Sequence, residues 1–500
     1  MDKNNDYKIS GTTKLHLEHL SNELFIDGRN IKSSSNITIN VHNPADESVI
    51  ATITDATLDE VNEAVFAANK ALNNATWSKM TPSNRERMLL KWADLIEQVT
   101  KTIAEILVLE QGKLLKDALG EVDACVRCFR YFAGLATKIQ GNTLDVSLIA
   151  PNTEYFAYTK REPVGVVAAI TPWNVPVMMF AWKVAPALAC GCTVVLKPSE
   201  ETPLTALFLA NLATEIGLPN GVLNVITGYG HTVGDALVKH KDIHKITFTG
   251  STETGKIIGK NAMQNLTRVT LELGGKNPVL VLDDADFSKV PASIARGIFY
   301  NQGQVCVSGS RIYLPHNQYD SLVNQLGDIA KKMPIGNGFD PNVAMGPLVS
   351  KTHQNRVLDF INKGKKDGVE VIAGGEKRYE NGYFVEPTIL ANPMNIAMQI
   401  AQEEVFGPVL IAMPYDDMED LIQKANDSEY GLSASIWSQD ISKVHRVIDR
   451  LKVGMIYVNS PVRSDPNLPL GGYKQSGIGR ELGASAIEQY TELKSVCIAY

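Results

Sequence analysis

The sequence predicts an α/β protein of two domains, each with a parallel sheet covered by helices on both faces. The chain has 500 residues, more than one hydrophobic core usually spans. Short apolar runs rich in β-branched residues recur along it, and segments with helical spacing separate them. Runs of this kind are typical of βαβ units whose strands are buried on both faces.

The N-terminal part is expected to be mostly helical. We expect a loosely ordered extension over the first twenty or so residues. Thr81 followed by Pro82 is typical of a helix N-cap and the first helical residue. From Met88 to Leu107 apolar residues recur at helical spacing, and Gly112 is the predicted end of this helix.

Two series of apolar runs predict the strands of the two sheets. Thr202 followed by Pro203 predicts a helix start within the first series. The domain boundary is predicted near residues 273–276, where two glycines suit a hinge or a tight turn. The first series is 164–170, 193–197, 222–226 and 245–249, and the second, from Asn277 to about Ser460, contains NPVLVL, RIYL, VEVIAGG and ASIWSQ.

Composition excludes several classes of function. The net charge is −7 and the pI about 5.8, so we expect no nucleic-acid partner and no anionic membrane surface. The sequence contains no run of ~18 apolar residues, so we expect no transmembrane helix. Its polar start lacks the pattern of a secretory signal. Six cysteines are too few for a disulfide scaffold, which indicates a reducing, cytoplasmic setting.

The predicted strands of the first sheet end in polar or glycine-rich groups. An open parallel sheet binds ligands beyond the carboxyl ends of its strands. The run from Gly250 to Gly255 is a strand-to-helix turn whose free N–H groups favour a phosphate, although a plain tight turn remains an alternative. Glu200 can accept hydrogen bonds from a ribose hydroxyl and would repel a 2′-phosphate, which favours NAD over NADP. The alternative is that Lys197 and Glu200 form a solvated pair.

A lone cysteine, Cys306, lies in the small-residue run NQGQVCVSGSR. It is either a buried structural thiol or a nucleophile, and a nucleophile must be helped to ionise because a free thiol has a pKa of about 8.5. Glu272, between two leucines, would have a raised pKa and suit a general base, unless it points into water. The Asn174 amide and the Cys306 N–H would stabilise an oxyanion, unless Asn174 is only a turn residue.

Seven segments appear in order along the chain and together resemble the aldehyde dehydrogenase superfamily, from about residue 22 to the C-terminus. They are TPWNVP, KPSEETP, FTGSTETG, LELGGKNP, NQGQVC, EEVFGPV and PLGGYKQSGIGRE. The resemblance implies two doubly wound parallel-sheet domains, a Rossmann-like cofactor domain and a catalytic domain, plus a small β oligomerisation element. The implied parts are an N-terminal extension (1–21), an NAD-binding domain (22–140 and 164–275), a catalytic domain (276–476) and an oligomerisation element (141–163 and 477–500), in a homodimer or homotetramer.

The resemblance also implies a mechanism. Cys306 attacks a small-molecule aldehyde, Asn174 and the Cys306 N–H hold the oxyanion, and hydride passes to the nicotinamide. Glu272 activates the water that hydrolyses the resulting thioester. Glu404 would bind the nicotinamide ribose and Phe406 would pack by the nicotinamide. The implied cofactor contacts are Thr171, Trp173, Lys197, Glu200, Gly230, Gly250, Ser251, Gly255, Leu273, Gln354, Glu404 and Phe406.

The predicted substrate tunnel is open and lined mainly by aliphatic residues. Arg463 at its mouth is a hypothetical partner for a substrate carboxylate, and a solvent-facing arginine is the alternative. Cys125 and Cys128 form a CxxC on a helical segment, which we interpret as two packed thiols, and no metal site is expected. The predicted pocket residues are Val175, Met179, Trp182, Val305, Val307 and Leu470.

Two other functions deserve comparison. In a CoA-acylating semialdehyde dehydrogenase, CoA would take the acyl group in place of water. Such relatives typically lack the water-activating glutamate, so Glu272 argues against this function. A non-catalytic protein on the same fold is disfavoured because Cys306, Asn174, Glu272 and Glu404 occur together.

Overall fold

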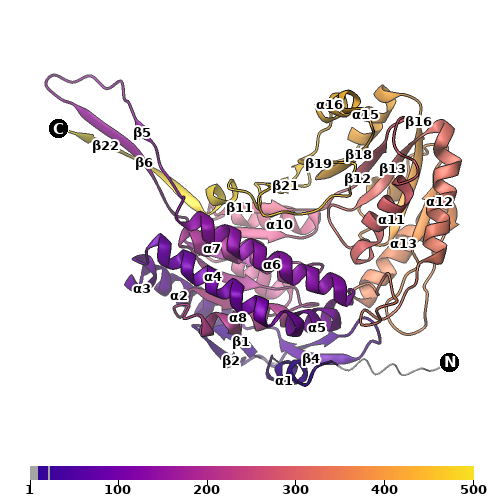
Figure 1. Cartoon of the computed structure of the whole chain (residues 1–500). Coiled ribbons are helices and arrows are strands. Elements are labelled where there is room, and N and C mark those ends of the chain that lie inside the picture. The colour runs from indigo at the N-terminus through magenta and orange to yellow at the C-terminus, as the bar shows by residue number, and fades with distance from the viewer. Residues whose placement is uncertain (1–8, 21–22) are drawn as a thin grey trace.

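A computed structural model describes residues 9–20 and 23–500 and contains two large sheets (Figure 1). The first has the strand order β2-β1-β9-β8-β7-β10-β11-β21, and its five central strands are parallel. Its edge pairs, β1 with β9 and β11 with β21, are antiparallel. The strands are β1 (Glu23–Ile26), β2 (Arg29–Lys32), β7 (Val166–Ile170), β8 (Thr193–Lys197), β9 (Leu223–Val225), β10 (Lys245–Thr249), β11 (Arg268–Glu272) and β21 (Gly477–Ile478).

The second sheet has the order β14-β15-β16-β13-β12-β18-β19 and is parallel except for the β14–β15 pair. The predicted α/β fold with two mainly parallel sheets is confirmed, whereas the antiparallel edges were not predicted. The strands are β12 (Asn277–Val281), β13 (Gly309–Pro315), β14 (Glu370–Ala373), β15 (Thr388–Ala391), β16 (Val409–Tyr415), β18 (Ser433–Trp437) and β19 (Met455–Val458).

Helices cover both faces of both sheets, as the buried apolar runs predicted. On one face of the first sheet lie α4 (Pro82–Gln98), α5 (Thr100–Gln111), α6 (Leu115–Ala136), α7 (Pro176–Cys190) and α8 (Leu204–Glu215). On the other lie α2 (Leu58–Asn73), α9 (Asp235–Lys239) and α10 (Thr252–Ala262). The second sheet packs between α11 (Val290–Phe299) and α12 (Tyr319–Lys332) on one face and α13 (Lys351–Asp367), α15 (Met418–Asn426) and α16 (Ile441–Ile448) on the other.

Helix ends follow the sequence signals only in part. Thr81 caps α4 and accepts a hydrogen bond from the Asn84 N–H, and α5 ends at Gly112, whose φ is +87°. The single helix predicted between them is wrong, because the chain breaks at Val99 and forms two. Thr202 does not cap α8. The buried Glu110 carboxylate does so from α5, at 2.7 Å from the Leu204 N–H.

The expectation of a loosely ordered N-terminal extension is wrong where the structure describes it. Helix α1 (Gly11–Leu20) packs against α5 and α8. Its Thr13 hydroxyl donates to the Glu105 carboxylate at 2.5 Å, and the Leu17 and Leu20 side chains are buried. The earlier part of the predicted extension, residues 1–8, lies outside the described residues, as do residues 21–22.

A three-stranded antiparallel sheet projects from the body as an arm (Figure 1). It consists of β5 (Thr143–Leu144), β6 (Tyr155–Pro163) and β22 (Thr491–Ala499), so its strands come from distant parts of the chain. Apolar side chains on it, including Phe156 and Leu493, are exposed. Among residues 9–20 and 23–500, no helix has the length and apolar character needed to cross a membrane.

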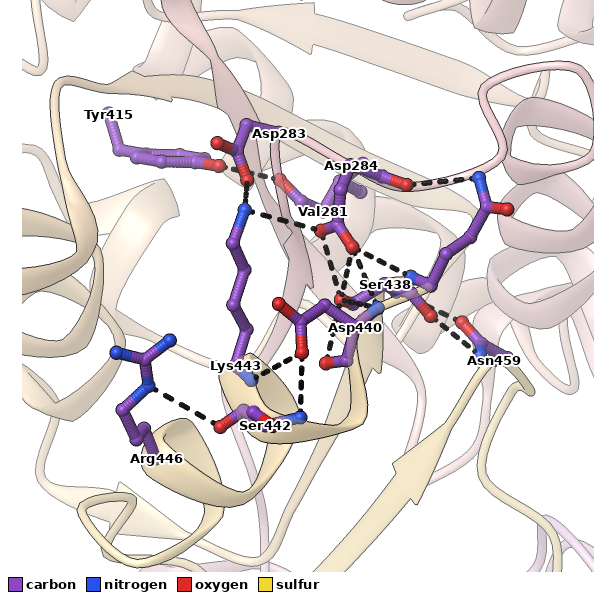
Figure 2. A network of polar contacts seen from close by, with 11 residues as sticks. Val281, Asp283, Asp284, Tyr415, Ser438, Asp440, Ser442, Lys443, Arg446 and Asn459 are labelled. Atoms are coloured by element: carbon purple, nitrogen blue, oxygen red, sulfur yellow. Dashed lines mark hydrogen bonds and ion pairs between the residues drawn. The ribbon is translucent and has the colours of Figure 1, made fainter.

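A polar network joins β12, β18 and α16 in the second domain (Figure 2). The Asp284 carboxylate accepts hydrogen bonds from the Ser438 hydroxyl at 2.9 Å and from the Asp440 N–H at 2.7 Å. Asp440 in turn caps α16, and Lys443 pairs with Asp283 at 2.5 Å. These contacts fix the turn that follows the carboxyl end of β18.

Candidate active site

The loop that carries Cys306 has an unusual backbone. Asn301, Gln302 and Gly303 adopt left-handed conformations, with φ of +48°, +58° and +70°. Asn277 on β12 donates its side-chain amide to the Cys306 carbonyl at 2.7 Å and to the Ser308 carbonyl at 2.9 Å. The thiol of Cys306 is therefore held on an ordered loop, and the residue is only partly buried.

Glu272 is the last residue of β11, and it is 3% exposed. Its two carboxylate oxygens find no hydrogen-bond partner among the described residues. The alternative that Glu272 points into water is therefore wrong. Burial raises the pKa of Glu272 well above its ordinary value, and the charge of Glu481 raises it further.

Two glycines let Glu404 and the Cys306 loop approach the end of β11. The Gly275 N–H donates to Glu404 Oε1 at 3.0 Å. A Cβ on Gly274 would lie 2.4 Å from Glu404 Oε2, and a Cβ on Gly275 would lie 2.9 Å from the Cys306 carbonyl oxygen. Any side chain at either position would displace one of these groups. The segment LELGG thus gathers Glu272, Glu404 and Cys306 into one place.

The electrostatics of this site favour protonated groups. Burial raises the pKa of Cys306 to about 12, and the nearby Glu404 and Glu272 raise it in the same direction. Burial likewise raises the pKa of Glu404 to about 7. Backbone N–H groups of Val307 and Cys306 act on the thiol in the opposite direction. A thiol with a raised pKa becomes a nucleophile only when a base takes its proton.

Asn174 lies at the carboxyl end of the first sheet and is 4% exposed. Its side-chain amide donates to the Gln304 carbonyl at 3.0 Å, two residues before Cys306. Its backbone carbonyl accepts a hydrogen bond from the Asn301 side chain at 2.9 Å. This bond uses one N–H of the Asn174 amide and joins the residue to the Cys306 loop.

The strand ends of the first sheet carry the predicted cofactor residues. Lys197 is buried, donates to the Pro198 and Gly228 carbonyls at 2.7 Å and pairs with Glu200 at 3.5 Å, so the solvated pair is wrong for Lys197. Gly230 begins the π-helix Gly230–Gly234, and a Cβ on Gly234 would lie 3.6 Å from Lys197 Cδ. The Thr171 N–H joins this edge by donating to the Lys197 carbonyl at 3.1 Å.

The predicted glycine-rich turn leads from β10 into α10. Ser251 is the N-cap of α10 and accepts from the Thr254 N–H at 3.2 Å. A Cβ on Gly250 would lie 2.4 Å from the Phe248 ring, and a Cβ on Gly255 would lie 2.4 Å from the Leu273 side chain. The turn is therefore closely packed, and the start of α10 keeps the open N–H groups and positive dipole end that suit a phosphate.

An aromatic cluster joins the two domains at the site. The Trp173 ring lies 4.9 Å from the His353 ring and 5.3 Å from the Phe406 ring. His353 Nε2 donates to the Phe406 carbonyl at 2.7 Å, which fixes Phe406 at a φ of +61°. Gln354, the predicted cofactor contact, is the next residue along the chain. Gln354 is fully buried, and its amide bonds the Phe384 carbonyl.

All but one of the predicted pocket residues lie in or against the core of the first domain. Val175, Met179, Trp182 and Leu470 belong to the core cluster of the first domain, and Val307 packs against that cluster. Val305 is half-buried next to Cys306.

Two tyrosines, Tyr131 and Tyr457, also pack against the core cluster, and the sequence reasoning missed them. The Ser464 hydroxyl lies 3.7 Å from Met178 Sδ, and Tyr457 donates to the Arg463 carbonyl. The mouth segment therefore borders Met178 and Tyr457, while the Arg463 side chain is exposed.

A buried ion pair beside Glu272 was also missed. Lys183 Nζ lies 2.5 Å from Glu481 Oε1, and Lys183 donates to Thr249 Oγ1 at 2.8 Å. Glu481 raises the pKa of Glu272 whereas Lys183 lowers it. A signal was present, because Lys183 is the one charged residue in the apolar helix α7.

A partly buried thiol beside one buried and one half-buried carboxylate is typical of enzymes that form a covalent intermediate on cysteine. Residues 31–496 match the profile of the aldehyde dehydrogenase family. A phenylacetaldehyde dehydrogenase from Pseudomonas fluorescens is 48% identical over 484 residues, 96% of each chain. The chain belongs to the aldehyde dehydrogenase family, which confirms the resemblance seen in the sequence motifs.

Solved structures show the same fold. An aldehyde dehydrogenase from Bacillus cereus, solved as an NAD+ complex, has a TM-score of 0.95 and 42% identity, and the match covers 98% of this chain and 99% of that one. A betaine aldehyde dehydrogenase from Staphylococcus aureus in complex with NAD+ has a TM-score of 0.94 and 40% identity, with 97% and 96% covered. Our chain is thus an oxidoreductase that acts on aldehydes.

Proposed function

We propose that this enzyme oxidises an aldehyde to its carboxylic acid through a thioester on Cys306, with NAD as the hydride acceptor. The observation that carries the proposal is Glu272, a buried carboxylate whose two oxygens find no hydrogen-bond partner in the described chain. An orphaned buried carboxylate costs folding free energy, so its presence beside Cys306 favours a catalytic role.

The first step is attack by sulfur on the aldehyde carbon. Glu272 takes the thiol proton in its ionised form as the S–C bond forms, and its raised pKa makes that carboxylate a stronger base. The carbonyl π electrons move to oxygen, and the thiohemiacetal oxyanion accepts hydrogen bonds from the Asn174 amide and the Cys306 N–H. Because Asn174 is bound to the Gln304 carbonyl, its amide is already oriented before the substrate arrives.

The residues at the strand ends fit a dinucleotide. Lys197 and Glu200 would hold the adenosine ribose, the start of α10 with Gly250, Ser251 and Gly255 would face the diphosphate, and Glu404 and Phe406 would face the nicotinamide end. Thr171, Trp173, Gly230 and Leu273 would complete this surface, whereas Gln354 is the weakest member because its side chain is already occupied. NAD supplies a hydride acceptor there, and Glu200 disfavours NADP.

Water completes the reaction. With its proton passed on to solvent, Glu272 deprotonates a water molecule, which attacks the thioester carbon and displaces the Cys306 thiolate as the carboxylic acid forms. The presence of Glu272 next to Cys306 favours water over CoA as the acyl acceptor. The orphaned carboxylate also disfavours a non-catalytic protein on this fold.

The substrate proposed is an aldehyde with an apolar body, which includes arylacetaldehydes. The relative from Pseudomonas fluorescens is named a phenylacetaldehyde dehydrogenase. Trp182 and Val175 lie in the adjoining core, and Tyr131 and Tyr457 pack against it. The cation in the predicted mouth segment, Arg463, is exposed to solvent, so a substrate carboxylate is not the favoured recognition element.

We keep the domain division as a proposal. Residues 22–140 and 164–275 form the cofactor domain, and residues 276–476 the catalytic domain. The arm made by 141–163 and the C-terminal strand would pair with a second copy in a homodimer or homotetramer, because its apolar side chains are exposed. A cytoplasmic location fits the six unpaired cysteines.

NADH formation by the purified enzyme tests the proposal. The panel contains phenylacetaldehyde, short and medium aliphatic aldehydes, an ω-carboxy aldehyde and a trimethylammonio aldehyde, each with and without CoA. We expect turnover without CoA, fastest for an apolar aldehyde, and none with Cys306→Ala. Turnover that persists in Cys306→Ala, or that requires CoA, would overturn the mechanism.

A further inference from the structure

A second buried ion pair, Lys113 with Glu121, lies next to the site and has no role in the steps above. Lys113 lies between α5 and α6, Glu121 lies on α6, and their side chains are 2% and 1% exposed. Burying two charges costs free energy, and an apolar pair of similar volume is often at least as stable. Stability alone therefore does not explain the pair.

Glu121 holds the first turn of helix α7. Its Oε1 accepts hydrogen bonds from the Val177 N–H at 2.9 Å and the Met178 N–H at 3.1 Å. Val175, the N-cap of α7, provides no side-chain cap in the described structure. Glu121 therefore acts as the cap from a neighbouring helix, with its charge at the positive end of the helix dipole.

Lys113 holds the residue just before that helix turn. Its ammonium donates to the Asn174 carbonyl at 3.1 Å, and Asn301 donates to the same oxygen at 2.9 Å. Asn301 belongs to the left-handed turn that leads to Cys306. The main chain of Asn174 is thus fixed from the helical layer by Lys113 and from the Cys306 loop by Asn301.

We propose that Lys113 and Glu121 are positioning residues for the oxyanion site. They hold Asn174 so that the free N–H of its amide faces the oxygen of the thiohemiacetal on Cys306. This inference rests on the proposed role of Asn174. Losing one oxyanion donor typically costs about 10²–10³ in kcat, and a misplacement of about 1 Å costs about 10².

The test is a double-mutant cycle on kcat with an aldehyde and NAD. Glu121→Gln keeps the side-chain shape and removes the charge, and we expect kcat to fall by roughly 10- to 100-fold with little change in the KM for NAD. In an Asn174→Ala background the same change should cost less than about twofold, because the donor being positioned is absent. Equal factors in both backgrounds would overturn the inference.

Two further measurements separate positioning from loss of structure. Alkylation of Cys306 by iodoacetamide develops no oxyanion, so its rate should stay near the wild-type rate in Glu121→Gln. Glu419→Gln, which breaks the exposed pair with Arg450, is the matched control and should leave kcat unchanged. If alkylation slows as much as oxidation does, the pair acts on the thiol loop and the inference is wrong.

A charge-neutral variant covers the case in which Glu121→Gln does not fold. Lys113→Met combined with Glu121→Gln leaves no lone buried charge. Its kcat should still fall, and a value within about twofold of wild type would overturn the inference. Asn174→Ala alone is the separate control, because an unchanged kcat there would refute the oxyanion role of Asn174 in the proposed function itself.

Discussion

Two carboxylates lie at the carboxyl ends of consecutive strands, one in each sheet, and have opposite surroundings. Glu272 ends β11, is 3% exposed and has no hydrogen-bond partner in the part of the chain described. Asp284, three residues beyond β12, accepts hydrogen bonds from Ser438, Gln439 and Asp440 (Figure 2). Burial raises the pKa of both carboxyls, but at Asp284 these hydrogen bonds and Lys443 outweigh it and lower the pKa.

The difference indicates that Asp284 stabilises the fold, whereas Glu272 is placed for catalysis. The hydrogen bonds of Asp284 exist only in the folded chain, so its charge stabilises the fold. The carboxylate of Glu272 is buried without hydrogen-bond partners among the described residues, and its charge therefore destabilises the folded state. The same lack of partners leaves the carboxylate available to take a proton. Removing each charge by an isosteric amide should therefore have opposite effects on activity and stability.

The largest effect is expected for activity. Glu272→Gln should lower kcat by about 10²–10⁴, the usual contribution of a general base, while Asp284→Asn should stay within about twofold because Asp284 lies outside the site. Steady-state NADH formation measures both. Similar losses in the two variants would remove the basis of the comparison.

The reactivity of Cys306 is the next effect. Because burial, Glu404 and Glu272 raise its pKa to about 12, the rate of alkylation by iodoacetamide in the absence of NAD should rise about tenfold per pH unit from pH 7 to pH 10, without a plateau. At pH 9, Glu404→Gln should react faster, and Asp284→Asn should not. A plateau near pH 8 would mean that the thiol is already activated in the free enzyme.

Loss of stability should appear in the second domain. Asp284→Asn should lower the free energy of unfolding by about 1 kcal/mol, less than is usual for hydrogen bonds to a charged group, because the side chain is 25% exposed and water can replace part of the network. The lowered pKa of Asp284 makes this difference full above about pH 4 and smaller as the pH falls further. Urea unfolding at pH 7 and at pH 3 measures it.

Much of this architecture could be predicted from local sequence. The features that were not predicted depend on contacts with residues distant in the sequence. The runs 193–197 and 245–249 coincide with β8 and β10 because continuous β-branched runs are buried on both faces. Edge strand β21 was missed because it pairs through two residues from near the C-terminus. The cap of α8 comes from Glu110, about 95 residues away, where Thr202 was expected.

The candidate site shows the same division. Cys306, Glu272 and Asn174 were predicted because each stands in a recognisable segment. Whether Glu272 faced water or the core depended on the β11–β21 pairing and on Gly471, whose added Cβ would lie 2.8 Å from Glu272 Oε1. His353 and Lys113 were missed because their importance comes only from the residues that they contact in the folded chain.

The smallest expected effect is the pH-dependent change in stability caused by Glu272→Gln, and it tests the contrast between Glu272 and Asp284 directly. The folded pKa of Glu272 is raised, so the protonated form is stable in the folded chain at low pH, and stability is lost as the pH rises from about 4.3 toward that folded pKa. Glu272→Gln escapes this loss. Its free energy of unfolding should equal that of wild type near pH 4 and exceed it by about 1 kcal/mol at pH 8. A Glu272→Gln enzyme that is less stable than wild type at pH 8 would mean that the carboxylate is satisfied by groups such as water, and that its placement reflects folding as much as catalysis.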